Sequence, residues 1–141
     1  MKISVFHIGK TKSQNLLNLS DDYMKRIGHY CAVEEEVFKS DDQVLKSVDS
    51  TDYLVVLDEK GKNVSSEGLS ELFLKHMNEA TKKIVFFIGG ADGVLPQIKK
   101  RANFILSLSK MTMMHEIALV VLMEQIYRAF TIIRNEPYHR G

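Results

Sequence analysis

The stretch IVFFIGGADG, Ile84 to Gly93, joins the most strand-like run of the chain to a cluster of glycines. Its first five residues are apolar, and most are β-branched or aromatic, which is typical of a strand buried on both faces of a sheet. Gly89 and Gly90 follow directly, and a glycine pair allows the backbone to turn sharply and to approach a ligand closely. The stretch predicts a buried strand that ends either beside a binding site or in a plain strand-to-helix turn.

The patterns on both sides of this stretch alternate between strand and helix. Runs of β-branched and aromatic residues predict strands at 2–8, 31–38, 53–58, 84–88 and 104–109. Apolar residues at helical spacing predict helices at 15 to about 29, 41–48, 65 or 66 to about 80, a short one near Pro96, and 114 or 115 to about 134. The segment EKGKNVSSEG, 59–68, predicts a loop. The alternation predicts one α/β domain over residues 1–141, with a mostly parallel sheet and helices on both faces.

Composition and charge exclude several classes of protein. Of the 141 residues 45% are hydrophobic and 26% are charged, and the formal net charge is +1. This balance gives no general attraction to nucleic acid, so an RNA contact would need a local basic patch. Cys31 is the only cysteine, which excludes an intrachain disulfide and favours a reducing compartment. The apolar runs are too short for a membrane span, and we expect a cytoplasmic protein.

Three loops are the first candidates for a binding site. Ligands of parallel α/β sheets bind beyond the carboxyl ends of the strands, so we expect a site among DEKGK, GGADG and SKMTM, at 58–62, 89–93 and 109–113. In LSLSKMTM, 106–113, backbone groups could bind the edge of an adenine between apolar walls formed by leucine and methionine. The alternative is an irregular loop whose leucines and methionines face the core. Asp58 and Glu59 could contact a ribose, although loop acids are mostly solvated.

The last helix and the tail carry the remaining candidates. Glu124 and Arg128 are spaced for an ion pair within the helix, which is the simpler interpretation of both. His115, near the start of the helix, is usually a surface or capping residue. The basic residues could contact phosphates or simply form a solvated surface; they are Lys99 to Arg101, Lys110, Arg128, Arg134 and Arg140. The tail NEPYHRG concentrates a phenol, an imidazole and a guanidinium in Tyr138, His139 and Arg140.

The sequence lacks the motifs of nucleotide-binding loops, nucleophilic hydrolases and metal sites. The glycine cluster is one residue short of the dinucleotide fingerprint, and no P-loop motif is present. No Gly-x-Ser-x-Gly elbow occurs, and Cys31 is expected mid-strand, far from the candidate loops. No set of His, Cys, Asp and Glu has the spacing of a metal site, so we expect no metal.

Taken together, VVLDEKGK…SSEGL, FFIGGADGVLP, LSLSKMT, MEQIYRAFTI and NEPYHRG occur in an order that resembles the ribosomal RNA large subunit methyltransferase H family, small members of the SPOUT superfamily. The resemblance covers the whole chain and is strongest from Tyr53 onward. It implies a trefoil-knotted α/β fold and an obligate homodimer. It also implies S-adenosylmethionine as methyl donor and N3 of a pseudouridine in 23S rRNA as acceptor (family position 1915).

The resemblance also assigns a cofactor pocket, which coincides with the loops above. Two residues near the start of the last helix depart from the family pattern. Met114 occupies a position where the family usually has proline, and Leu119 one where the family often has a basic residue. By position, the cofactor residues are Leu57, Gly89, Gly90, Leu108, Ser109, Lys110, Met111, Thr112 and Met113.

The resemblance implies that the tail, with Tyr138, His139 and Arg140, forms part of the active site. His139 is the first candidate for the base that removes the N3 proton, and His115 is the second. Arg140 would hold a phosphate or a uracil oxygen, and Tyr138 would stack on the base or donate a hydrogen bond. We expect the tail to reach the cofactor loops of the partner subunit. A non-catalytic nucleotide- or RNA-binding dimer and a flavodoxin-like module are the alternatives.

Overall fold

The computed structural model describes residues 1–140 of the 141. Five parallel strands form one sheet in the order β2-β1-β4-β3-β5. The strands are β1 (Lys2–Ile8), β2 (Val33–Phe38), β3 (Tyr53–Asn63), β4 (Lys83–Ile88) and β5 (Phe104–Ser107). The helices are α1 (Gln14–Ile27), α2 (Asp41–Ser47), α3 (Ser66–Asn78), α4 (Pro96–Arg101) and α5 (His115–Ile133). The predicted alternation is confirmed.

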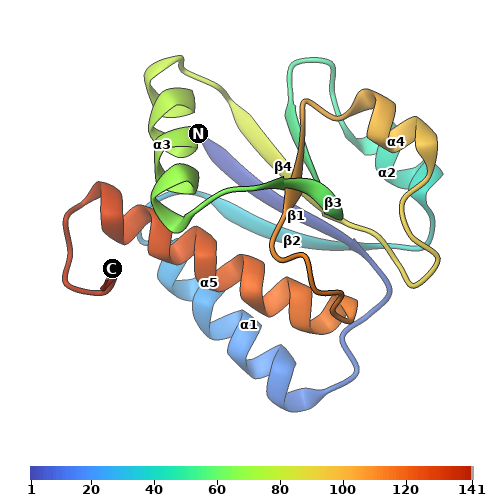
Figure 1. Ribbon diagram of the computed structural model, residues 1–141, viewed down its shortest axis with the longest axis horizontal. Coiled ribbons are helices and arrows are strands. Elements are labelled where there is room, and N and C mark those ends of the chain that lie inside the picture. Colours follow the sequence, from blue (N-terminus) through green and yellow to red (C-terminus); the bar gives the residue numbers. More distant parts are fainter. Residues whose placement is uncertain (141) are drawn as a thin grey trace.

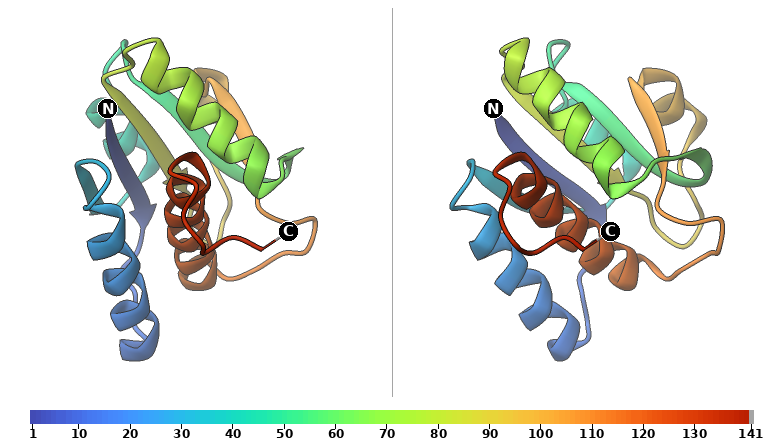
Figure 2. Two further views of the ribbon diagram at one scale, coloured as in Figure 1. Left: turned by 90° about the vertical axis from the view of Figure 1, so that its left-hand side faces the viewer. Right: turned by 60° about the vertical axis from the view of Figure 1, so that its left-hand side comes forward.

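Helices cover both faces of the sheet (Figures 1 and 2). Successive side chains of a strand point to opposite faces, so each strand contributes to two cores. On β4, Ile84, Phe86 and Ile88 pack with α1, α3 and α5, whereas Val85 and Phe87 pack with α2 and α4. This burial on both faces accounts for the unbroken apolar run of β4, and the predicted parallel sheet between two helical layers is confirmed.

Serine caps set the starts of three helices. Ser13, Ser40 and Ser65 each accept a hydrogen bond from a backbone N–H in the first turn, at 3.3, 3.4 and 3.0 Å. Of the two serines expected to cap α3, Ser65 does so. Pro96 is the first residue of α4, where its fixed φ suits a helix start.

Strand β3 is longer than the sequence predicts. Residues 59–63 were expected in a loop, but they continue the strand, and after an irregularity Lys62 and Asn63 pair with β5. Gly61 makes this approach possible, because a Cβ there would lie 2.6 Å from the carbonyl oxygen of Ile105. The side-chain amide of Asn63 also donates to the carbonyl of Ser107 at 3.1 Å. Pairing with β5 thus overrides the low strand propensity of these polar residues.

Three smaller differences concern the residues at which a helix or strand begins or ends. The helix expected to reach about residue 29 ends at Ile27, and the strand expected from Cys31 begins at Val33. The strand expected to end at 109 ends at Ser107, whose hydroxyl donates to the carbonyl of Ser109 at 2.9 Å and turns the chain away from the sheet. That turn directs the segment between β5 and α5 across the carboxyl ends of the neighbouring strands.

Candidate active site

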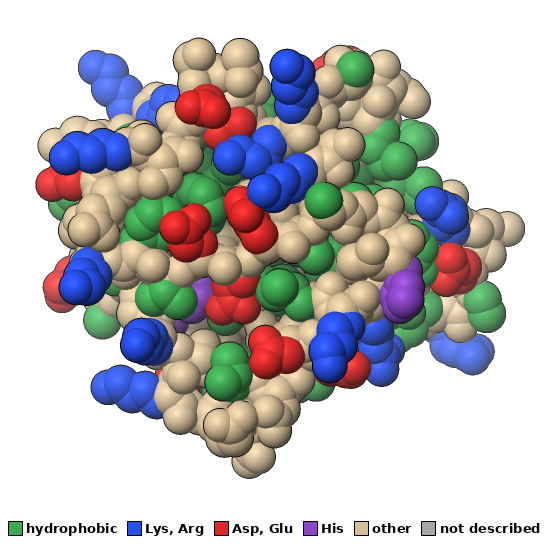
Figure 3. All heavy atoms as spheres, turned by 180° about the vertical axis from the view of Figure 1, so that it is seen from behind, with side chains coloured by type: hydrophobic (Ala, Val, Ile, Leu, Met, Phe, Trp, Pro, Cys, Tyr) green, Lys and Arg blue, Asp and Glu red, His purple; other side chains and the backbone are tan. Residues whose placement is uncertain are grey.

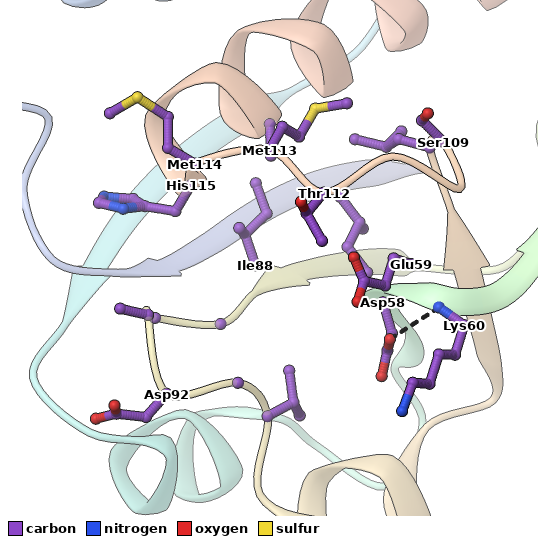
Figure 4. A pocket seen from close by; sticks show the side chains of 18 of the residues that line it. Asp58, Glu59, Lys60, Ile88, Asp92, Ser109, Thr112, Met113, Met114 and His115 are labelled. Carbon is purple, nitrogen blue, oxygen red and sulfur yellow. Dashed lines mark hydrogen bonds between the residues drawn. The ribbon is translucent and has the colours of Figure 1, made fainter.

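One pocket of about 790 Å³ lies beyond the carboxyl ends of β3, β4 and β5 (Figure 4). All three loops that the sequence indicated contribute to it, together with the first residues of α5. Leu57 and Ile88 are paired across β3 and β4, so their ends form the floor. The other lining residues are Asp58 to Lys60, Gly89 to Val94, Lys99, Leu108, Ser109, Met111 to His115, and Ala118. The pocket is large enough for a nucleoside-sized ligand.

The glycine segment after β4 forms a wall of exposed backbone. Gly93 has a φ of +85°, and its N–H donates to the carbonyl of Gly90 at 3.0 Å, which closes a tight turn. A Cβ on Gly89 would lie 2.8 Å from Cγ2 of Val94 and 3.2 Å from the carbonyl oxygen of Gly93. The turn therefore folds back on the strand end with no room for a side chain at Gly89, and it brings main-chain groups to the ligand side.

The segment after β5 forms the opposite wall. The N–H of Met111 donates to Oγ of Ser109 at 3.0 Å, so a serine side chain shapes this loop. Met111 is 78% exposed, and Met113 and Met114 are also exposed beside the pocket. Of the nine cofactor residues expected from the sequence, eight line the pocket; Lys110 is exposed and is not among its lining residues.

An ion pair at the pocket wall was not foreseen from the sequence. Nζ of Lys99, on α4, lies 2.6 Å from Oδ2 of Asp58, at the end of the main run of β3. The N–H of Lys60 donates to Oδ1 of the same carboxylate at 3.0 Å (Figure 4). The hydrogen bond from Lys99, followed by that from Lys60, holds the pKa of Asp58 below its usual value. Asp58 is therefore an ionised part of the wall, only 16% exposed, rather than a solvated loop acid.

His115 begins α5 and lines the pocket, whereas the tail does not. Nε2 of His115 is buried and has no hydrogen-bond partner within residues 1–140. Tyr138 packs edge-on against Tyr127, with ring centroids 4.7 Å apart. An α-helix rises about 1.5 Å per residue, which separates Tyr127 from His115 by about 18 Å along α5. Within one subunit, the structure brings His115 to the pocket and leaves Tyr138, His139 and Arg140 away from it.

The tail is docked on its own subunit through His139. The guanidinium of Arg128 donates to Nδ1 of His139 at 3.0 Å, since arginine has no acceptor. Nε2 of His139 then donates to Oε1 of Glu67, at 2.6 Å. Both ring nitrogens are engaged in this position, so neither is free to contact a substrate. Arg140 is exposed.

Tyr138 is held beside the imidazole by three aromatic or cationic neighbours. Its hydroxyl lies 3.3 Å from that of Tyr23, and the guanidinium of Arg128 lies 4.8 Å from its ring centroid. Burial, and then the hydrogen bond with Tyr23, raise the pKa of Tyr138 to about 12. The phenol is therefore neutral near pH 7 and is unsuited to act as a base. The predicted ion pair of the last helix is confirmed, with 2.7 Å between Nε of Arg128 and Oε1 of Glu124.

Several basic residues that could have contacted phosphates have structural partners. Arg101 donates to the carbonyls of Asp49 and Asp52, at 2.8 and 3.0 Å. The guanidinium of Arg134 lies 5.5 Å from the ring centroid of Tyr30. Lys99 and Arg128 are also paired, and the exposed members of the set are Lys100, Lys110, Arg134 and Arg140. Four of the seven basic residues are therefore engaged by other groups of the same chain.

Residues 1–140 offer neither a reactive cysteine nor a cluster of side chains that could hold a metal ion. Burial raises the pKa of Cys31 to about 11, so its thiol is neutral near pH 7. Residues 1–140 contain no cluster of three or more His, Cys, Asp or Glu side chains arranged to hold a metal ion. Across the same residues, none of the helices combines the length and apolar character that crossing a bilayer would require.

Comparison with known proteins agrees with this architecture. The profile of the family described as "Predicted SPOUT methyltransferase" matches residues 1–139. A ribosomal RNA large subunit methyltransferase H from Flavobacterium johnsoniae is 40% identical, over 99% of each chain. A probable methylase family protein from Haemophilus influenzae has a similar structure, with a TM-score of 0.60 and 12% identity over 99% of this chain and 70% of that one. A putative methyltransferase from Legionella pneumophila, solved with bound SAM, has a TM-score of 0.52 and 10% identity over 92% of this chain and 66% of that one.

The fold is that of the SPOUT methyltransferases, and the predicted α/β-knot fold class is confirmed. Within that class, the chain belongs to the ribosomal RNA large subunit methyltransferase H family.

The two residues that depart from the family pattern near the start of α5, Met114 and Leu119, lie in different surroundings. Met114 lines the pocket and is 57% exposed, so this position faces the ligand side. Leu119 is fully buried in the core formed with α1 and α3. Its side of α5 packs in that core. Leucine here contributes to packing rather than to contact with RNA.

Proposed function

We propose that the protein transfers a methyl group from S-adenosylmethionine to N3 of a pseudouridine in 23S rRNA, at family position 1915. The observation that carries this proposal is the single pocket of about 790 Å³ that the three strand-end loops form together. Sequence identity of 40% to a ribosomal RNA large subunit methyltransferase H supports the choice of acceptor. The cytoplasm, where ribosomes are present, is the expected location.

The pocket walls suit an adenosine moiety with a charged side arm. The chain around Leu108 to Met113 offers main-chain groups to an adenine edge, between apolar side chains. Leu57 and the backbone at Gly89 and Gly90 would close the other side, where a Cβ at Gly89 would collide with the turn. The ionised Asp58 lies on the wall as well and can accept hydrogen bonds from ribose hydroxyls.

When bound, S-adenosylmethionine supplies a methyl group on a sulfonium, a good leaving group, so the protein mainly has to hold the acceptor in line. As the new bond to N3 forms, the bond to sulfur breaks, and the N3 proton must pass to a base. His139 is our first candidate for that base, and His115 at the pocket wall is the second. Arg140 would hold a phosphate or a uracil oxygen, and Tyr138 would stack on the base or donate a hydrogen bond.

Two subunits are needed for this arrangement. In one chain the tail packs about 18 Å along α5 from His115, and both nitrogens of His139 are engaged by Glu67 and Arg128. We propose a homodimer in which the tail leaves these partners and covers the pocket of the other subunit. Each active site would then combine a pocket from one chain with Tyr138, His139 and Arg140 from the other.

The substrate is expected to be an assembled ribosome or large subunit rather than free RNA. The net charge is +1, and the face in Figure 3 shows Lys and Arg interspersed with Asp and Glu rather than gathered in one patch. Such a surface gives little of the phosphate attraction on which binding to naked RNA depends. A rate on free 23S rRNA equal to that on ribosomes would contradict this expectation.

The decisive test is mass spectrometry of rRNA from a strain that lacks the gene. Loss of 3-methylpseudouridine, restored by the wild-type gene, is the expected result; unchanged rRNA would contradict the proposed reaction. Calorimetry with S-adenosylmethionine and S-adenosylhomocysteine tests the cofactor separately. Heat with neither compound would favour the alternative, a non-catalytic RNA-binding dimer.

A further inference from the structure

A fully buried histidine lies behind the wall of the pocket. His7, near the end of β1, is 0% exposed and occupies the same sheet face as the apolar Ile3 and Val5. Its Nε2 lies 2.6 Å from Oε2 of Glu35 on the edge strand β2, and its Nδ1 lies 3.0 Å from the carbonyl oxygen of Gly9. A carbonyl oxygen can only accept, so Nδ1 carries a proton and donates to Gly9.

The two contacts fix the imidazole at both of its nitrogens. A buried polar group without partners would cost free energy, and one partner alone would still allow the ring to turn. Glu35, whose side chain is 14% exposed, prevents that turn, because it holds Nε2 from the neighbouring strand. The ring in turn holds the carbonyl of Gly9, whose φ of +84° starts the chain reversal after β1.

The Gly9 turn lies against His115. A Cβ placed on Gly9 would be 3.7 Å from Nε2 and 3.9 Å from Cε1 of His115, so the edge of the ring lies close to this turn. The ring centroids of His7 and His115 are 6.4 Å apart. In Figure 4 the ring of His115 extends toward the segment that follows β1 and away from Asp58 and Lys60. The same segment is fastened to α5 by the N–H of Lys12, which donates to the carboxylate of Glu116.

We propose that His7, held in place by Glu35, is a positioning residue for His115 and acts through its hydrogen bond to the Gly9 turn. The proposal rests on the proposed function, in which His115 stands at the wall of the methyl-transfer pocket. His7 touches no ligand: it holds the turn that supports the edge of the His115 ring. With the hydrogen bond from His7 to Gly9 intact, His115 keeps one orientation; without that hydrogen bond, the Gly9 turn can shift and the ring of His115 can rotate.

Two substitutions separate the two contacts of His7. The side-chain amide of asparagine stands close to the place of Nδ1, so His7→Asn keeps a donor for Gly9 and loses Glu35. Glutamine reaches the place of Nε2, so His7→Gln keeps the contact with Glu35 and loses Gly9. If positioning runs through the turn, His7→Gln should disturb His115 and His7→Asn should not, although both remove the same ring.

The first readout is the NMR signal of the His115 ring, which needs no turnover. His7→Gln is expected to shift or broaden this signal, and His7→Asn to leave it near its wild-type position. In the methylation assay, His7→Gln should lower kcat about tenfold, since a small misplacement at a reacting site is costly. Its KM for ribosomes and its Kd for S-adenosylmethionine should stay within about twofold, as expected when orientation rather than binding is affected. A purely structural role would change the two variants alike, which would overturn the proposal.

A wild-type measurement covers the case in which neither variant folds. The geometry predicts a nuclear Overhauser contact between Hε1 of His115 and the α protons of Gly9, and its absence would also overturn the proposal. The NMR readout does not require turnover, so it can be separated from a failure of the proposed function. An enzyme without methyltransferase activity would refute the proposed reaction while the NMR comparison still reported on the positioning of His115.

Discussion

His139 and Glu67 are joined by a contact of 2.6 Å between Nε2 of the imidazole and Oε1 of the carboxylate. This contact ties the last residues of the chain to the first turn of α3, on the same subunit. With Arg128 on the other ring nitrogen, both nitrogens of His139 are engaged by groups of the same chain. In the proposed dimer, the tail would have to leave this position before His139 could reach the acceptor.

Ending the chain after Glu136 should abolish methylation while the domain remains folded. The truncated chain keeps the hydrogen bond from Tyr30 to Glu136, of 2.7 Å, and loses only the docked tail. We expect at least about a hundredfold loss of kcat, as for the removal of a catalytic group. The Kd for S-adenosylmethionine, measured by calorimetry, should be little changed.

Mixed dimers extend this experiment. A truncated chain paired with a chain whose pocket is blocked by Leu108→Arg should regain one working site, because each contributes what the other lacks. Activity of the truncated homodimer, or no recovery in the mixed dimer, would contradict the composite site.

Acid should release the tail through Glu67. The hydrogen bond from His139 holds the pKa of Glu67 below its usual value of 4.5. A lowered pKa means that the ionised form is favoured in the docked state, so docking is complete above pH 4.5 and weakens as the pH falls through the lowered value. NMR relaxation of the amides of Tyr138 and His139 should report increasing mobility over that range. In Glu67→Gln this carboxylate transition should be missing; if it persists, another group controls the tail.

Loss of the ion pair at the pocket wall should destabilise the fold at neutral pH only. Lys99→Met lets the pKa of Asp58 return toward its usual value of 3.8. Because that pKa is lowered in the folded state, the stabilisation is present above pH 3.8 and fades in acid. Since Lys99 is 40% exposed, we expect only about 0.5–1 kcal/mol at pH 7. Urea unfolding at neutral and acidic pH measures this difference, and the exposed Lys100→Met should show none.

Gly61→Ala should destabilise the protein through the pairing of β3 with β5. The new Cβ would lie 2.6 Å from the carbonyl oxygen of Ile105, a backbone atom that cannot move aside cheaply. Overpacking of this kind costs about 1–3 kcal/mol. The matched control is Gly68→Ala in α3, where the nearest atoms are 3.4 Å away and alanine should stabilise the helix by up to about 1 kcal/mol. Equal melting temperatures for the two variants would contradict this account of β3.

Met114→Pro should be tolerated, although the residue precedes the last helix at the pocket. Its φ is −62°, which a proline ring adopts without strain, and its carbonyl still accepts from Ala118. A gain of about 0.4–1 kcal/mol is expected from the stiffer unfolded chain. Met111→Pro should instead lose the N–H that donates to Ser109 and unfold at a lower temperature. If thermal unfolding ranks the two variants in the opposite order, this view of the loop is wrong.

The sequence alone predicted the layers of the fold because burial leaves a direct trace in local pattern. The unbroken apolar run of β4 and the serine that precedes α3 identify their elements without knowledge of their neighbours. The three loops at the strand ends followed from the same reasoning, and the structure places all three at one pocket. The extension of β3 to Asn63 left no such trace, because only its pairing with β5 stabilises those polar residues.

The tertiary structure decided which residues far apart in the chain contact one another. Asp58 with Lys99, and His7 with Glu35, have no spacing that a sequence motif could reveal, because each pair joins two separate elements that only the folded chain places side by side. The sequence indicated that Tyr138, His139 and Arg140 carry chemistry, but only the fold shows that they do not line the pocket of their own chain and that Tyr138 packs on Tyr127, about 18 Å along α5 from His115. Periodicity records which faces are buried, whereas contacts between distant segments depend on how the chain closes on itself.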